Sequence, residues 1–214
     1  MVKLTRLPAL THLATQLRTA DFPLAENWHA VEELFTSWAA QPELRDELRG
    51  HLRRLQPADA DAIRTGSRET TTHFAWCLLN SPRDEFSFWL HEYKPQQDWR
   101  HGYADSVHNH RYHFCTTILR GSYVHERYDA LVDPRTELIT SANLLKRNTC
   151  SAGASGALTA DQFHRIPEAS GDTMTFLVKS RPVTDSSVSY DPTTGISHRH
   201  VPMEVRLEEL ADLI

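Results

Sequence analysis

Cysteine is scarce in this sequence. Among 214 residues there are three, Cys77, Cys115 and Cys150. Their number is odd and no two share the Cys-x-x-Cys spacing, so the sequence predicts neither a disulfide scaffold nor a structural zinc knuckle. This cysteine usage is typical of a protein from a reducing compartment.

Long hydrophobic runs are also missing. No apolar stretch approaches the length that crosses a bilayer. Residues 1–17 carry Lys3 and Arg6, but Pro8 and several polar residues interrupt any apolar core of a signal peptide. We therefore expect a soluble protein, most simply cytoplasmic, with no membrane partner.

Positive charge is not in excess either. The formal net charge is -5 and the isoelectric point is near 6.2, which argues against nucleic acid as a main partner. The one basic row, Arg45, Arg49 and Arg53, is interleaved with acidic residues such as Asp46. Mixed signs at this spacing are typical of a solvated helix face, which we favour over a phosphate-binding patch.

What the sequence does contain begins with helical periodicity in its first third. Apolar residues recur at i, i+3 and i+4 in residues 10–17, 28–38 and 44–55. The aromatic stripe of Trp28, Phe35 and Trp38 is interpreted as core packing and not as a cofactor site. We predict an N-terminal helical segment, residues 1–66, packed on a second segment, residues 67–214, in one structural domain.

From residue 70 onward the pattern becomes that of strands. Stretches rich in β-branched and aromatic residues alternate with turn residues such as Arg120-Gly121-Ser122. Many short strands at fairly regular spacing predict a mainly β sandwich or barrel, and a short closing helix is expected over residues 204–213. The expected strands are residues 70–79, 86–93, 115–119, 123–128, 137–145, 173–178, 186–190 and 197–201.

The most informative motif is His108-Asn109-His110, with His164 further along the chain. Residues i and i+2 of a strand point to the same face, so the first two imidazoles can share one metal ion. A third imidazole from a distant strand can complete the set and leave positions open for substrate and dioxygen, as a catalytic metal requires. We expect His108, His110 and His164 to be the metal ligands.

Other interpretations of the histidines remain open. The chain has 13 of them, so the spacing can arise by chance, and His198-Arg199-His200 repeats it as a rival pair. His125 and others could line a pocket or have structural roles. Nor does the sequence choose the metal, because three imidazoles accept zinc, nickel, copper or manganese as well as iron.

The region around the first motif resembles a known family, the cupins. The pattern that resembles their first conserved motif is Gly102, five residues, His108-Asn109-His110, three residues, Phe114, six residues and Gly121. Phe114 stands where most cupins place a glutamate ligand.

Further along, the chain looks like the cysteine dioxygenase branch of that superfamily. The residues that carry this likeness are Phe163-His164-Arg165, Lys179-Ser180-Arg181-Pro182 and residues 190–195. The resemblance covers roughly residues 86–195, and helices before the barrel also fit this branch.

The resemblance implies a mainly β, cupin-type (jelly-roll) β-barrel with N-terminal α-helices. It also implies a mononuclear non-heme iron(II) dioxygenase that binds a small thiol, such as cysteine, together with dioxygen and oxidises it to a sulfinate. No acid follows His110 before Glu126, which favours a three-histidine site. A neutral ligand set accepts an anionic thiolate without accumulating negative charge on the metal.

The family also implies a cysteine and a tyrosine at the site. Cys115 lies five residues after His110, where some members carry a cysteine that crosslinks to a tyrosine, but the matching strand end carries Lys179. Tyr103 or Tyr190 is then the available partner, and we take Cys115 and Tyr190 as candidate catalytic residues. The alternative for Cys115 is a small, buried, apolar residue.

The substrate is less well defined. The family holds its substrate carboxylate with an arginine on an early strand, but residues 73–77 contain none, although Arg68 and Arg83 flank them. Arg165 follows His164 directly and points to the opposite face of a regular strand. Two alternatives therefore stay open: a metal-dependent biosynthetic cupin acting on a non-thiol small molecule, and a non-catalytic cupin that binds a ligand. The sequence predicts no oligomeric state.

Overall fold

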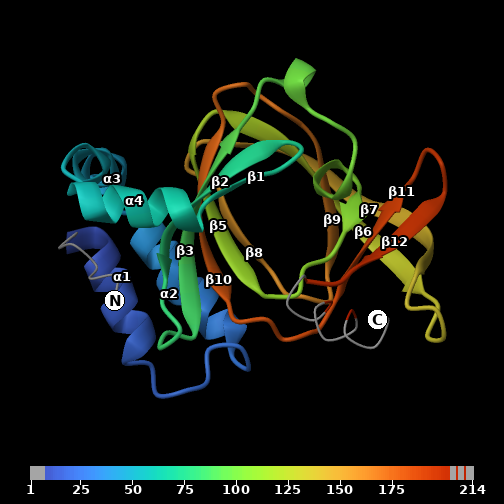
Figure 1. The fold of residues 1–214 in the computed structure, drawn as a ribbon, viewed down its shortest axis with the longest axis horizontal. Coiled ribbons are helices and arrows are strands. Elements are labelled where there is room, and N and C mark those ends of the chain that lie inside the picture. Colours follow the sequence, from blue (N-terminus) through green and yellow to red (C-terminus); the bar gives the residue numbers. More distant parts are fainter. Residues whose placement is uncertain (1–7, 203–205, 207–209, 211–214) are drawn as a thin grey trace.

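The computed structural model describes residues 8–202 together with residues 206 and 210. In this part of the chain, helices come first and strands follow (Figure 1). The helices are α1 (Pro8–Arg18), α2 (Trp28–Ala39), α3 (Leu44–Arg53), α4 (Pro57–Gly66) and the short 3-10 helices η1 (Gln96–Asp98) and η2 (Tyr103–Asp105). The strands are β1 (Arg68–Glu69), β2 (His73–Asn80), β3 (Phe86–Tyr93), β4 (Val107–His108), β5 (Phe114–Arg120), β6 (Ser122–Val132), β7 (Ile139–Ser151), β8 (Ser155–Leu158), β9 (Phe163–Ala169), β10 (Met174–Ser180), β11 (Ser187–Asp191) and β12 (Ile196–His200).

The strands form two six-stranded antiparallel sheets. The first has the order β1-β2-β3-β10-β5-β8 and the second has the order β12-β11-β4-β9-β6-β7. From β3 to β11 the chain alternates between the sheets, with the β6–β7 hairpin as the one departure, and this alternation is the connectivity of a jelly roll. The expected mainly β jelly roll with N-terminal helices is confirmed. The described strands form two separate sheets and are not closed into one hydrogen-bonded barrel.

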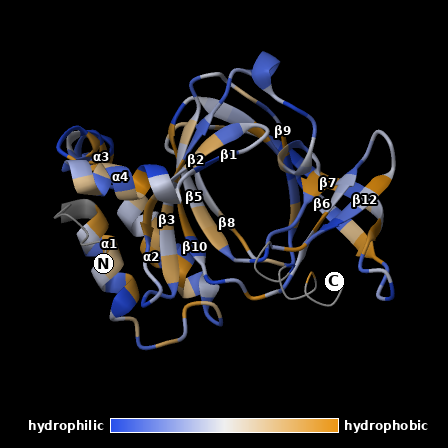
Figure 2. Ribbon diagram, in the orientation of Figure 1, coloured by the Kyte–Doolittle hydropathy of each residue, from blue (hydrophilic) through white to orange (hydrophobic). Residues whose placement is uncertain are grey.

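The helices cover the outer face of the first sheet (Figure 1). The ring centroid of Trp38 lies 4.8 Å, and that of Phe35 6.3 Å, from the ring of Phe176 on β10. These residues belong to one buried apolar cluster that joins helices and sheet, and Figure 2 shows apolar residues along β3 and β10 where the layers meet. The interpretation of the aromatic stripe on α2 as core packing is confirmed. None of the helices in residues 8–202 is long and apolar enough to span a bilayer.

Alternate side chains of β10 point to opposite faces of the first sheet, and one set faces the candidate functional site. Phe176 and Val178 join the apolar cluster beneath the helices, whereas Thr175, Leu177 and Lys179 line a cavity between the two sheets. Residues 175–180 are all buried, because the helices cover one face of the strand and the second sheet encloses the other. A lysine on the cavity face of this strand is therefore removed from bulk water.

The elements differ from the sequence-based expectation in several places. Helix α4 begins at Pro57, where the helical pattern ends in the sequence, because the first turn of a helix tolerates a residue without an N–H. Strand β7 continues to Ser151, six residues beyond the predicted end, and β1 and β8 were not expected. Strands were assumed at His108 and at His164, where β4 and β9 lie, but the expected strand does not extend to His110. The closing helix predicted over residues 204–213 lies outside the described residues except at 206 and 210, and residues 1–7 lie outside them too.

Candidate metal centre

Three histidines converge on the inner face of the second sheet. His108 ends β4, His110 follows it in the adjoining loop, and His164 on β9 is the strand partner of His108. One ring nitrogen of each lies within 4.8 Å of the others. Asn109, between the first two, turns away and hydrogen-bonds to neighbouring backbone. The structure thus brings together the three residues that the i, i+2 spacing and the distant histidine predicted as ligands.

Hydrogen bonds determine which ring nitrogens are free. Nδ1 of His108 lies 2.8 Å from the carbonyl oxygen of Ser106, which can only accept, so Nδ1 carries the proton and Nε2 keeps a lone pair. Nε2 of His110 and Nε2 of His164 face each other at 2.9 Å. Two such nitrogens are satisfied by one proton between them or by one cation that both ligate.

His125 on β6 lies behind His164. Its Nε2 is 3.1 Å from Nδ1 of His164. When Nε2 of His164 acts as a metal ligand, its Nδ1–H donates to His125, and this bond holds the ring in position. The sequence left the role of His125 open, because the pairing of β6 with β9 that brings it here is not visible in any local pattern.

Burial keeps the three candidate ligands uncharged. The pKa of His108 falls to about 4, and the pKa values of His110 and His164 lie well below the usual value, with desolvation as the main cause in each case. All three imidazoles are therefore neutral at neutral pH, which is the form that binds metals. This donor set fits a divalent transition-metal ion with open coordination positions.

No carboxylate among the described residues joins this set. Glu126, the first acid after His110, is buried but does not line the cavity. Its oxygens accept hydrogen bonds from Arg147 and Tyr128, both at 2.7 Å. The candidate ligand set is therefore of the three-histidine kind that the sequence favoured.

The histidines open onto a cavity of about 920 Å³ between the two sheets. Tyr103 and Phe114, which also line the cavity, pack against the cluster, with ring centroids 4.4 Å from His108 and 5.0 Å from His110, respectively. The hydroxyl of Tyr103 donates to the carbonyl of Asn109.

A second group of nitrogen-bearing side chains lines the wall formed by the first sheet. Arg68, His73, His91 and Lys179 come from β1, β2, β3 and β10 and face the same cavity. Nζ of Lys179 lies 3.4 Å from Nε2 of His91, whose ring stacks on that of His73 with centroids 4.2 Å apart. No function was predicted from the sequence for His73, His91 or Lys179. The available indication was a charged residue inside the otherwise apolar run of β10.

The structure does not bring Cys115 and Tyr190 to the histidines. Cys115 follows Phe114 on β5 and points to the opposite side, where it is fully buried in the apolar cluster under the helices. Burial raises the pKa of its thiol. Tyr190 on β11 is not among the described residues that line the cavity, and its hydroxyl lies near Gly195 in the β11–β12 turn. Cys115 has the environment of a small apolar residue, the alternative that the sequence left open.

The rival histidine pair gathers no third ligand in the described part of the chain. Nε2 of His200 lies 2.7 Å from the hydroxyl of Ser189, and the ring of His200 is 6.4 Å from that of His198, centroid to centroid. The site at His108, His110 and His164 is therefore the better metal centre.

The arginines occupy three different environments. Arg68 lines the cavity, whereas Arg83 lies in a separate hollow near α1. Arg165 donates to the carbonyl of Asp105 at 2.7 Å and is directed away from the cavity, as its place after His164 predicted. Of the arginines considered for substrate binding, Arg68 is the one that reaches the site.

No family model matches the chain, and no curated protein matches it. Among solved structures it is similar to an oxalate decarboxylase of Lactobacillus farciminis in a formate complex, with 16% identity over 55% of this chain and 31% of that chain and a TM-score of 0.38. It is also similar to the hydroxypropylphosphonic acid epoxidase from S. wedmorenis, with 14% identity over 54% of this chain and 56% of that chain and a TM-score of 0.36. It is similar as well to the 7S globulin of Momordica charantia, with 12% identity over 63% of this chain and 34% of that chain and a TM-score of 0.39. The matches span between about a third and just over half of the length of these proteins, and at such identities and TM-scores they carry no argument about activity.

Proposed function

We propose that the protein is a mononuclear metal enzyme of cupin type, in which His108, His110 and His164 bind one iron(II) ion, and that it oxidises a small thiol with dioxygen to a sulfinate. The observation that carries the proposal is the convergence of three imidazole nitrogens within 4.8 Å on the wall of a cavity. Iron(II) bound there would supply electrons and open coordination positions for dioxygen and a substrate donor atom. A ligand set without a carboxylate supports an anionic donor such as a thiolate.

The chain's own residues prepare this chemistry. Ser106 holds His108 in the tautomer that offers Nε2, and His125 does the same for His164. Tyr103 and Phe114 pack against the cluster, and the reacting end of a substrate meets it from the cavity. The partners we propose are a small-molecule substrate and dioxygen, and not nucleic acid or a membrane.

A second candidate keeps the metal and changes the substrate to a non-thiol small molecule. It is favoured by one specific observation: neither Cys115 nor Tyr190 faces the cavity, so the expected cysteine–tyrosine pair is not available at the histidines. Lys179, at the strand end where the family's tyrosine was expected, faces the cavity instead.

The first test is the metal content of protein purified without an affinity tag. We expect near-stoichiometric iron in the wild type, and its loss in His108→Ala and in His164→Ala because each removes one of three ligands. His101→Ala is the matched control, since that histidine is exposed and pairs only with Asp105. Elemental analysis of the four proteins measures the outcome.

The second step uses an oxygen electrode with cysteine and cysteamine on the iron-loaded protein. Oxygen uptake with formation of a sulfinate supports the thiol reaction, and iron without thiol turnover selects the second candidate. Metal content that is unchanged in both ligand variants, or failure to bind any divalent metal on reconstitution, contradicts the proposal and leaves a ligand-binding protein.

A further inference from the structure

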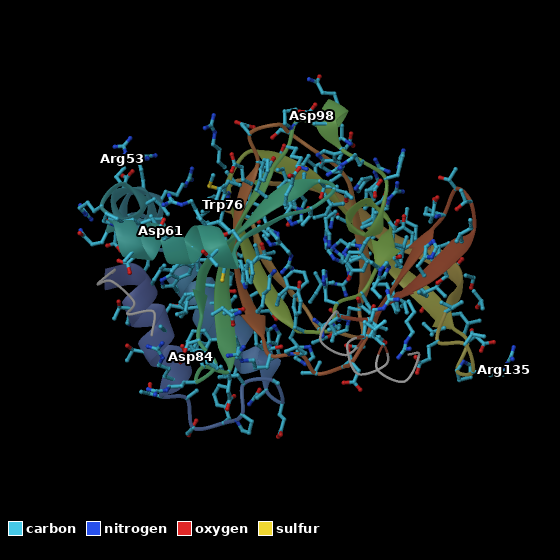
Figure 3. The ribbon with its side chains drawn as sticks, viewed as in Figure 1. Arg53, Asp61, Trp76, Asp84, Asp98 and Arg135 are labelled. Atoms are coloured by element: carbon cyan, nitrogen blue, oxygen red, sulfur yellow. The ribbon has the colours of Figure 1, made fainter. Side chains whose placement is uncertain are left out.

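The cavity carries charge of one sign. The basic side chains among its described lining residues are Arg68, Arg127, Lys146 and Lys179. The same lining residues include no aspartate or glutamate, although the chain as a whole has a net charge of -5. Acidic side chains such as Asp61 on α4 and Asp98 on η1 lie away from the cavity (Figure 3). A metal ion at the histidines would add further positive charge to this space.

Lys179 is the most constrained of these basic residues. It is 4% exposed, and no carboxylate in the described part of the chain lies within ion-pair distance of its Nζ. Lys94, the other buried lysine of the described residues, is fully paired: its Nζ lies 2.6 Å from Glu69 and 2.7 Å from the carbonyl of Thr70. A buried ammonium without such a partner is unfavourable, so Lys179 lacks a counter-ion that this fold supplies elsewhere.

The groups around Lys179 are neutral or cationic. Its Nζ lies 4.5 Å from the centre of the Trp89 ring, and the guanidinium of Arg68 lies 5.1 Å from the same ring. Both cations lie near the same aromatic ring and repel each other, and an anion that binds both reduces that repulsion. The titratable and charged groups that face Lys179 are Arg68 from β1, His73 and Cys77 from β2, His91 from β3, and His110 and Tyr112 from the β4–β5 loop.

We propose that Lys179, with Arg68 and His91, forms a binding site for an anionic group of the substrate on the wall opposite the metal ligands. The substrate is then a small organic anion whose carboxylate or similar oxyanion binds at Lys179, while its other end reacts at His108, His110 and His164. An ammonium and a guanidinium together offer several charge-assisted hydrogen bonds to such a group. The reacting end rests on the proposed metal function, but the anion site itself requires no metal.

Anion binding at this position is linked to protons. Burial, with a contribution from Arg68, lowers the pKa of Lys179 to about 7. An anion beside Nζ favours the charged form and raises that pKa. Binding just above neutral pH therefore takes up a proton, which a surface lysine, already charged, does not do.

The test is isothermal titration calorimetry on the full chain after treatment with a chelator, with sulfate and glutarate as probes. These two anions carry no titrating proton near neutral pH and distinguish a tetrahedral oxyanion from a carboxylate. We expect at least one to bind, with affinity roughly ten- to hundredfold lower in Lys179→Met because a hydrogen-bonded charge is lost. Titrations in two buffers of different ionisation enthalpy should show proton uptake in the wild type and none in Lys179→Met.

Two further variants make the result specific. Lys146→Met removes an exposed cation that lines the cavity on β7, and should bind like the wild type. Lys179→Arg keeps the charge but does not titrate, so it should bind the anion without proton uptake. Because this variant is tested by retained binding, it keeps the anion site testable if Lys179→Met does not fold. Equal affinity in wild type and Lys179→Met, an equal loss in Lys146→Met, or no binding of either anion by the wild type would overturn the anion site.

The anion site and the metal centre can be disproved separately. Because the titrations use metal-free protein, a loss of the proposed iron function leaves the anion result standing. Conversely, stoichiometric iron in a protein that binds neither probe contradicts the anion site alone.

Discussion

At the scale of single residues, the partner behind each ligand is as important as the ligand. His125 accepts a hydrogen bond from Nδ1 of His164 when the other nitrogen binds a metal, so it acts as a positioning residue. We predict that His125→Ala lowers metal affinity about 10–100-fold while leaving the saturated stoichiometry unchanged. Competition with a chromophoric chelator measures the affinity. His198→Ala, an exposed histidine on β12, is the control, and equal affinities in both variants would contradict this role.

The residues of the site differ in how far the sequence revealed them. His108 and His110 were predictable because they lie two residues apart, although the strand rule that paired them does not hold: β4 ends at His108, and His110 lies in the loop that follows. Lys179 was not, because β10 is buried on both faces and the strand was expected to end at residue 178, one residue before the lysine. Which face meets the cavity depends on where the helices pack, and that is a property of the whole fold.

The two neighbours Phe114 and Cys115 show how much depends on one position. Both are buried on β5, and both are apolar enough for either side of the sheet. A shift of one residue reverses the side to which every side chain of a strand points. In the structure Phe114 faces His110 and Cys115 faces the helices, so the family resemblance suggested a cysteine at the site where the strand places a phenylalanine.

At the scale of elements, the β5–β6 turn depends on Gly121. Its φ is +73°, and a Cβ there would lie 2.6 Å from Oγ1 and 2.7 Å from Cα of Thr173. We predict that Gly121→Ala lowers the free energy of unfolding by about 2–4 kcal/mol, from backbone strain and the steric clash together. Urea unfolding measures the change. Gly156→Ala in β8 is the control, because a Cβ there meets nothing within 4 Å, and similar losses in both variants would disprove the explanation.

Strands with a local sequence pattern were predictable, and length was not decisive: β11 and β12, with five residues each, were expected one residue from their places, but the end of the 13-residue β7 was missed by six. The long strands β2, β3, β6 and β10 have local patterns, and each was expected within a few residues of its place. Strand β4 has two residues and owes its existence to pairing with β11 on one side and β9 on the other. No local window contains that information, and yet β4 carries His108.

At the scale of the whole molecule, the helices and the second sheet together create two different environments for the first sheet. Its outer face packs on α1 and α2 through a large apolar cluster, and its inner face carries Lys179, His91 and His73 toward the cavity. The second sheet contributes the candidate metal ligands. The cavity therefore joins residues from both halves of the jelly roll, and neither sheet forms the site alone.

The number of buried histidines predicts that the metal-free protein is sensitive to acid. Burial lowers the pKa of His73 to about 3 and that of His108 to about 4, and it holds the pKa values of His91, His110 and His164 well below the usual value. In the unfolded chain all of them titrate near about 6.5. Below that pH the unfolded state binds more protons than the folded state, so stability is retained above it and is lost as the pH falls toward the folded pKa values.

The expected size of this effect allows a direct test. Each such histidine contributes a loss of about 1.4 kcal/mol in the free energy of unfolding per pH unit over that interval. Urea unfolding of chelator-treated protein at about pH 7 and about pH 5 should show a large loss in the free energy of unfolding. His73→Gln removes one titrating ring outside the metal ligands and should reduce the pH slope by the contribution of one histidine.

A divalent metal should add stability near neutral pH, and the gain should disappear on acidification because protons and metal compete for the same nitrogens. An equal free energy of unfolding at the two pH values would mean that these rings are solvated and charged in the folded protein, which is incompatible with a neutral three-histidine metal centre.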